Sequence, residues 1–194
     1  MKKVIYIIVV LLLCSTGISQ KKYSLYAPKD VIELAPKIAL SQVGVREVGN
    51  NSGERVERYL ASVGLKKGNP YCASGIYWSW ATALDSLGYG LESMPLPRTG
   101  LAYGMYLYAK THGKLSPYKA AIADCIDWRY PGKSSGHIEI IVKLGDNGWV
   151  NSVGFNSGGR TGRDGQGVHL QTRNIYLPLH RMQIMGLIGF KWKM

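Results

Sequence analysis

The sequence has few cysteines, no long apolar run and no repeated or low-complexity segment. The apolar run over residues 4–13 is about half of the roughly 20 residues that a membrane-spanning helix needs. No linker divides the chain, and its 194 residues are enough for a domain with a real hydrophobic core. We therefore expect one domain and no transmembrane span.

Residues 1–19 instead have the pattern of a secretory signal peptide. Two lysines precede the apolar run, and small residues stand just before Gln20, where we expect cleavage. This predicts an exported mature domain of residues 20–194, periplasmic or extracellular. Lipidation at Cys14 is the less favoured alternative, because Leu13 stands where a lipoprotein signal has a small residue.

Acidic residues are scarce relative to basic ones. The 24 lysines and arginines outnumber the 12 aspartates and glutamates, which gives a formal net charge of +12. A basic surface favours anionic partners, and export makes membrane headgroups or cell-wall polymers better candidates than nucleic acid. The charge is equally compatible with a role in solubility alone.

The mature domain has two cysteines, Cys72 and Cys125, in a compartment that permits disulfides. They could form one bridge, or one could be a working thiol and the other a buried bystander. Cys72 is the candidate nucleophile, because it lies in GNPYCASGIYWSW (68–80) at the start of a predicted helix. The positive end of a helix lowers a thiol pKa, and its free N–H groups can stabilise an oxyanion.

The periodicity of apolar residues changes along the chain. It predicts helices over 30–43, 54–63, 72–87 and 99–111, followed by strands over 137–144, 149–153, 167–171 and 186–192. Asn51 and Glu54 resemble a capping box that opens the second helix. Helices followed by an antiparallel sheet are typical of the α+β class.

A cysteine nucleophile needs a base, and the sequence offers four histidines. His137 is the strongest candidate, because it follows a loop and opens the strand HIEIIVKL, where a packed helix could bring a sulfur within reach. His112 is typical of a helix C-terminus, and His169 and His180 of packed or surface positions.

Four segments, taken in their order along the chain, carry a resemblance to a known family: GVREVGNNSGERVERYLASVG (44–64), NPYCASGIYWSW (69–80), SGHIEIIV (135–142) and VNSVGFNSGG (150–159). Together they resemble the secreted papain-like amidases and peptidases of the CHAP and NlpC/P60 group. MGLIGFKW (185–192) is also similar to the last core strand of that group. The resemblance implies a papain-like α+β fold, with N-terminal helices packed on a C-terminal antiparallel sheet.

The resemblance also implies a reaction, the hydrolysis of amide bonds in peptidoglycan or its stem peptides. Cys72 would be the nucleophile and His137 the general base and later the acid, with no cofactor or metal. His137-x-Glu139 lacks the spacing of a zinc protease motif. We expect a monomer, and it stays open whether a separate inhibitor protein restrains it.

The third catalytic residue is where the sequence departs from the family pattern. In CHAP members, the strand after the histidine resembles a Glu-Gly-Asn segment. The matching stretch of this chain is Gly154-Phe155-Asn156. We predict that Asn156 orients the imidazole, since an amide oxygen can accept from its N–H. Glu139 is the second candidate, and it could equally be a surface carboxylate paired with a lysine.

Two other features have both a functional and a structural interpretation. The loop NSGGRTGRDGQG (156–167) is typical of a flexible connection, or of a mobile rim whose Arg160 and Arg163 hold substrate carboxylates. It lacks the lysine and spacing of a phosphate loop. Tyr77, Trp78 and Trp80 indicate a core more than a sugar platform.

A different class of function stays open beside the hydrolase. The chain could be a secreted wall-binding or interaction protein that keeps the fold without turnover, with Cys72 bridged to Cys125. A bridged Cys72 could not act as a nucleophile, so the state of this thiol separates the two functions.

Overall fold

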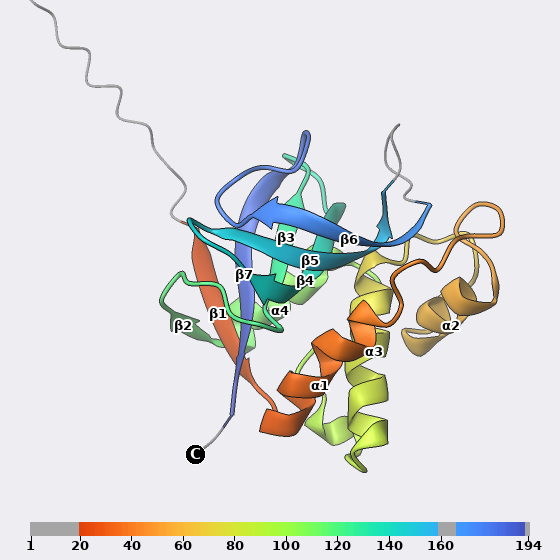
Figure 1. Ribbon diagram of the computed structural model, residues 1–194, viewed down its shortest axis with the longest axis horizontal. Helices are drawn as coiled ribbons and strands as arrows, with labels where there is room; N and C mark the ends of the chain where they lie inside the picture. Colours follow the sequence, from red (N-terminus) through yellow and green to blue (C-terminus); the bar gives the residue numbers. More distant parts are fainter. Residues whose placement is uncertain (1–19, 159–165, 193–194) are drawn as a thin grey trace, which may run out of the picture.

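The structure is a computed structural model that describes residues 20–158 and 166–192. The predicted signal peptide and the two loop arginines, Arg160 and Arg163, lie outside the described residues. Four α-helices and a seven-stranded sheet make up the described part (Figure 1). The α+β class is therefore confirmed.

The helices are α1 (Lys29–Leu40), α2 (Glu54–Ser62), α3 (Cys72–Ser86) and α4 (Ala102–His112), with a short 3-10 turn at Leu91–Ser93. The strands are β1 (Lys21–Tyr26), β2 (Lys114–Ser116), β3 (Cys125–Arg129), β4 (Gly136–Leu144), β5 (Trp149–Ser157), β6 (Gly167–Asn174) and β7 (Gln183–Lys191). All four predicted helices are present, and the four predicted strands correspond to β4–β7.

The sheet differs from the prediction because it is mixed rather than antiparallel. Its strand order is β2-β1-β7-β3-β4-β5-β6, and β1 pairs with β7 in parallel while the other pairs are antiparallel. The strands β1, β2 and β3 were not predicted. Strand β3 has only five residues, too few to show a clear period in the sequence.

Helix α3 is the central element of the helical layer. It lies between α1 and α2 (Figure 1), and it contacts both of these helices as well as β4 and β5. Ten of its fifteen residues are buried, which suits a helix enclosed by neighbours on most sides. Tyr77 and Trp80 are among them and Trp78 is half-buried, so the aromatic cluster belongs to the core as expected.

The start of α2 corrects the predicted capping box. The residue before the helix is Gly53, with φ of 109°, and the backbone N–H of Asn51 donates to Glu47 Oε2 rather than to Glu54. Asn51 adopts a positive φ of 47° two residues earlier. Among the helices of the described segments, none has the length and apolarity to cross a bilayer.

Candidate active site

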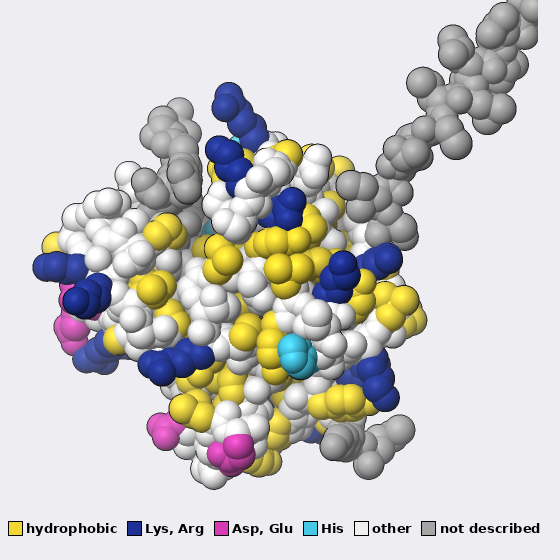
Figure 2. Space-filling model, turned by 180° about the vertical axis from the view of Figure 1, so that it is seen from behind, with side chains coloured by type: hydrophobic (Ala, Val, Ile, Leu, Met, Phe, Trp, Pro, Cys, Tyr) yellow, Lys and Arg dark blue, Asp and Glu magenta, His cyan; other side chains and the backbone are white. Residues whose placement is uncertain are grey.

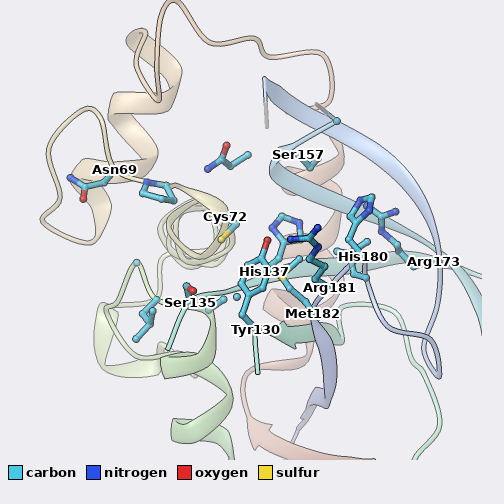
Figure 3. Close-up of a pocket in the computed structure, with 18 of the residues that line it drawn as sticks. Asn69, Cys72, Tyr130, Ser135, His137, Ser157, Arg173, His180, Arg181 and Met182 are labelled. Carbon is cyan, nitrogen blue, oxygen red and sulfur yellow. The ribbon is translucent and has the colours of Figure 1, made fainter. Parts of the chain in front are cut away.

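Cys72 and His137 line the same cavity, which has a volume of about 600 Å³. The cavity lies between the first turn of α3, the start of β4 and the turn of residues 179–182 that precedes β7. In Figure 3 the Cys72 sulfur points toward His137. The structure thus brings together a thiol and an imidazole that are 65 positions apart in the chain.

Cys72 is the first residue of α3; its thiol is free, and the residue is 5% exposed. Along the described chain, no side chain caps the N-terminus of this helix. The first backbone N–H groups of a helix have no partner within it, so those of α3 remain available to a ligand beside the sulfur. The site therefore combines a thiol with unpaired donors at the positive end of a helix.

The backbone before His137 is held very close to β3. A Cβ atom on Gly136 would lie 2.0 Å from the carbonyl oxygen of Trp128, so this position accepts only glycine without a backbone shift. The Trp128 ring stacks on the imidazole with centroids 6.3 Å apart and an interplanar angle of 26°. Strand pairing and this indole together fix the direction of the His137 ring.

His137 is hydrogen-bonded on both sides. Its Nε2 donates to Glu139 Oε1 over 3.2 Å, which leaves the other ring nitrogen for Cys72. Burial by itself would lower the pKa of His137. The hydrogen bonds and charges of Cys72 and Glu139 outweigh burial and raise the pKa from 6.5 to about 10. The arrangement therefore favours an imidazolium next to the sulfur.

Glu139 is fully buried, and both of its oxygens are satisfied. Ser152 Oγ donates to Oε2, and Arg173 on β6 donates through Nη2 to Oε1 over 2.8 Å and through Nε to Oε2 over 3.1 Å. Burial would raise the pKa of Glu139, but His137 and Arg173 lower it to about 2. A carboxylate thus lies between an imidazolium and a guanidinium.

The glycine opposite Glu139 makes room for this carboxylate. Gly154 on β5 is the register partner of Glu139, and a Cβ at Gly154 would lie 2.9 Å from Glu139 Oε1. Position 154 is also where the resemblance to CHAP sequences led us to expect a carboxylate. In this chain a carboxylate occupies the space in front of that position, but it comes from the neighbouring strand.

Asn156 lines the cavity but makes no hydrogen bond with His137 in the described part of the chain. The contact that we expected between this amide and the imidazole is therefore not made, and Glu139 makes it instead. The pairing of β5 with β4 ends at Gly154, and Asn156 has a positive φ of 53°, which turns its side chain out of the ladder. Its backbone N–H donates to the Tyr71 hydroxyl, while its buried Oδ1 has no partner among the described residues.

Cys125 is the second candidate thiol, and it lies fully buried on β3. It is free, as is Cys72, so no disulfide joins them. Burial, with the nearby charges of Asp124 and Asp127, raises the pKa of Cys125 well above its usual range. A buried thiol of this kind is a poor nucleophile.

The remaining histidines have different surroundings. His112 stacks on Tyr108 at the end of α4, and His169 is part of β6. His180 lines the cavity, a position that the sequence gave no reason to expect. Ser152, Arg173 and Arg181 are likewise site residues that were not predicted, because each reaches the site only through pairing of distant strands. No group of three or more His, Cys, Asp or Glu side chains in residues 20–158 and 166–192 is arranged to hold a metal ion.

No known protein family matches the sequence, and no curated protein matches it. The crystal structure of Ly7917 is similar to this chain with a TM-score of 0.45 and 16% sequence identity. The similarity covers 81% of this chain and 62% of that one, so this chain spans less than two thirds of the length of its structural neighbour.

Proposed function

We propose that the protein is an exported cysteine hydrolase of the papain-like CHAP and NlpC/P60 type that cleaves amide bonds in peptidoglycan. The observation that carries the proposal is the line of hydrogen bonds from Cys72 through His137 to Glu139. A thiol at a helix N-terminus, next to an imidazole held by a buried carboxylate, is the arrangement that activates a sulfur nucleophile.

The reaction follows from these positions. The Cys72 thiolate attacks the amide carbonyl carbon, and the oxyanion that forms faces the free N–H groups at the start of α3. The imidazolium of His137 gives its proton to the leaving amine as the C–N bond breaks, which leaves a thioester on Cys72. His137 then takes a proton from water, the hydroxide attacks the thioester, and the carboxylic acid product leaves as the thiolate re-forms. This chemistry needs no metal or organic cofactor.

Glu139 and Asn156 have separate roles in this proposal. Glu139 fixes the imidazole and favours its protonated form, the role that the sequence had suggested for Asn156. Asn156 lines the cavity, and its side chain has no hydrogen-bond partner in the described part of the chain, so its amide is free to contact the substrate. We therefore assign Asn156 to substrate binding beside Cys72.

The choice of peptidoglycan rests on three features. The four sequence segments resemble enzymes that act on this polymer, the first 19 residues resemble a signal peptide, and the net charge is +12. Figure 2 shows Lys and Arg side chains spread over the face that is visible, with few acidic ones between them. A basic surface of this kind is attracted to anionic wall polymers.

Digestion of purified peptidoglycan tests the proposal. Residues 20–194 should release soluble fragments with new amine and carboxylate ends, identified by mass spectrometry. Cys72→Ala should release none, because only the thiolate can start the reaction. Cys125→Ser should keep most of the activity, which makes it the matched control. Release of the same fragments by Cys72→Ala would show that a different residue carries the chemistry.

Alkylation of the oxidatively purified protein separates the hydrolase from a wall-binding protein without turnover. Iodoacetamide should label Cys72 rapidly and Cys125 only after unfolding. A Cys72 that is inert until the protein is reduced would favour the bridged, non-catalytic alternative.

A further inference from the structure

Arg181 lies on a tight turn at the edge of the cavity. Leu179 and Met182 exchange two backbone hydrogen bonds of 3.0 and 2.9 Å, so His180 and Arg181 are the central residues of a two-residue hairpin loop. His180 has the positive φ of 53° that such a turn requires. In Figure 3, Arg181 points into the cavity on the side of His137.

This turn is anchored to the core of the domain. Met182 is buried in an apolar cluster with Trp128, and Leu179 packs against the same cluster. The Trp128 indole N–H also donates to the carbonyl oxygen of Leu177 over 3.2 Å. The tryptophan that stacks on His137 therefore also holds the segment that carries Arg181. The backbone of Arg181 is consequently fixed relative to the reacting pair.

The positive charge of Arg181 is not compensated within the described residues. Its side chain has no hydrogen bond or ion pair with any of them, and no Asp or Glu is among the described residues that line the cavity. Arg173 lines the same cavity, but its guanidinium is bound to Glu139. A guanidinium in a concave site without a carboxylate partner is suited to a carboxylate of the ligand, which it can bind through two parallel hydrogen bonds.

We propose that Arg181 binds a free carboxylate of the substrate close to the scissile amide. The protein then prefers stem peptides with a free carboxylate over the same peptides with a carboxamide. The inference rests on the proposed function, since the cavity is the one that contains Cys72. A cavity of about 600 Å³ has room for a short peptide segment with both the amide and the carboxylate.

Binding to an inactive variant tests the inference without turnover. The Cys72→Ala protein is titrated calorimetrically with soluble stem peptides released from purified peptidoglycan. A second titration uses the same peptides after their carboxylates have been converted to carboxamides with carbodiimide and ammonia. The carboxylate form should bind about 10- to 100-fold more tightly, the range expected for one charge-assisted pair.

A second substitution assigns that preference to Arg181. Adding Arg181→Gln to Cys72→Ala should remove the difference between the two forms, and Arg181→Lys should retain part of it. Arg55→Gln is the control, because Arg55 is an exposed arginine on α2 that does not line the cavity. Arg181 is an exposed turn residue, so its variants should unfold at the same temperature as their parent.

The possible outcomes separate the two proposals. A carboxylate preference that persists in Arg181→Gln, or one that is absent from the parent, overturns the inference and leaves hydrolysis standing. Carboxylate-selective binding through Arg181, with no cleavage of peptidoglycan by the wild-type chain, overturns hydrolysis alone. If neither peptide form binds at millimolar concentration, the inference and the proposed substrate both fail.

Discussion

Replacing Glu139 by glutamine tests the hydrogen-bond line on which the proposed chemistry depends. Glutamine has nearly the volume of glutamate and keeps an oxygen that can accept from His137 Nε2. It lacks the negative charge that favours the imidazolium and pairs with Arg173. The substitution therefore removes a charge while leaving a hydrogen-bond acceptor in place.

The structure sets the size of the effect. A hydrogen bond between charged groups contributes about 1.5–3 kcal/mol. One pKa unit corresponds to about 1.4 kcal/mol, so loss of the charge should lower the His137 pKa by about 1–2 units. The pKa of His137 is about 10 in the intact site. The basic limb of kcat/KM should therefore move down by about 1–2 pH units, since the leaving amine needs a protonated imidazole. We expect kcat to fall by about 10²- to 10⁴-fold, as for other sites that lose the group orienting a base.

The assay is the pH dependence of amide hydrolysis, measured with folded protein at each pH. Breaking a buried ion pair destabilises a protein by about 3–5 kcal/mol, so the thermal unfolding of Glu139→Gln must be measured in parallel. Ser152→Ala is the matched control, because it removes one hydrogen bond to the carboxylate but leaves its charge. It should lower kcat by less than about tenfold.

One result would refute this reasoning. If Glu139→Gln kept its rate and its basic limb while Asn156→Ala lost activity, the orienting role would belong to Asn156, as the sequence first suggested. Two nearly neutral results would instead indicate a Cys–His dyad that needs no third residue.

Two further predictions concern the surroundings of the site. Asp127 is fully buried, and neither of its oxygens has a hydrogen-bond partner among the described residues. Burial, followed by the charge of Cys72, raises the pKa of Asp127 well above its usual range. A raised acid pKa makes the free energy of unfolding fall as pH rises above about 4, by at most about 1.4 kcal/mol per pH unit. Chemical denaturation at a series of pH values measures how steeply the free energy of unfolding falls with pH. The fall should be less steep in Asp127→Asn than in the wild type, and an equal slope would contradict the burial argument. Gly154→Ala should lower kcat and also move the basic limb of kcat/KM to lower pH. The reason is that its Cβ would lie 2.9 Å from Glu139 Oε1 and displace this carboxylate. Gly104→Ala is the control, since the nearest atom to its Cβ lies at 3.5 Å; equal activity of the two variants would show that the carboxylate needs no such space.

The parts of the site that the sequence predicted are those encoded by local pattern. Cys72 stands where helical periodicity begins, and His137 stands where a loop gives way to a strand rich in β-branched residues. Each signal lies within a dozen residues of the side chain that it positions. The four helices and the strands β4–β7 were predicted for the same reason.

The missed parts depend on contacts between distant segments. Strand β1 pairs in parallel with β7 at the opposite end of the chain, and β3 is buried between β7 and β4. Short strands of this kind have little periodicity of their own. Arg173 joins the site only because β6 pairs with β5 and β5 with β4, so neither its position nor its partner could be read from its neighbours in sequence.

The choice between Asn156 and Glu139 shows this dependence most clearly. Extending the β4–β5 register from the pair Glu139–Gly154 by two residues would place Asn156 opposite His137. The ladder stops at that pair, and the positive φ of Asn156 turns the chain away. Glu139 lies on the same face as His137, about 7 Å along the strand. The two side chains together bridge that distance, with Glu139 Oε1 3.2 Å from His137 Nε2. The sequence contained both candidates, but the choice depended on where the ladder ends.

The position of the carboxylate also explains why a glycine stands opposite Glu139. Their positions are directly opposite on neighbouring strands, so a side chain from either one can enter the same space beside the imidazole. Both could not carry a carboxylate there, because two such groups within about 3 Å would repel and one would stay protonated. With glycine at 154, the carboxylate of residue 139 has that space, and Arg173 and Ser152 hold its charge in place. A carboxylate beside the base can thus come from either of two positions across the ladder, and this chain places it at residue 139.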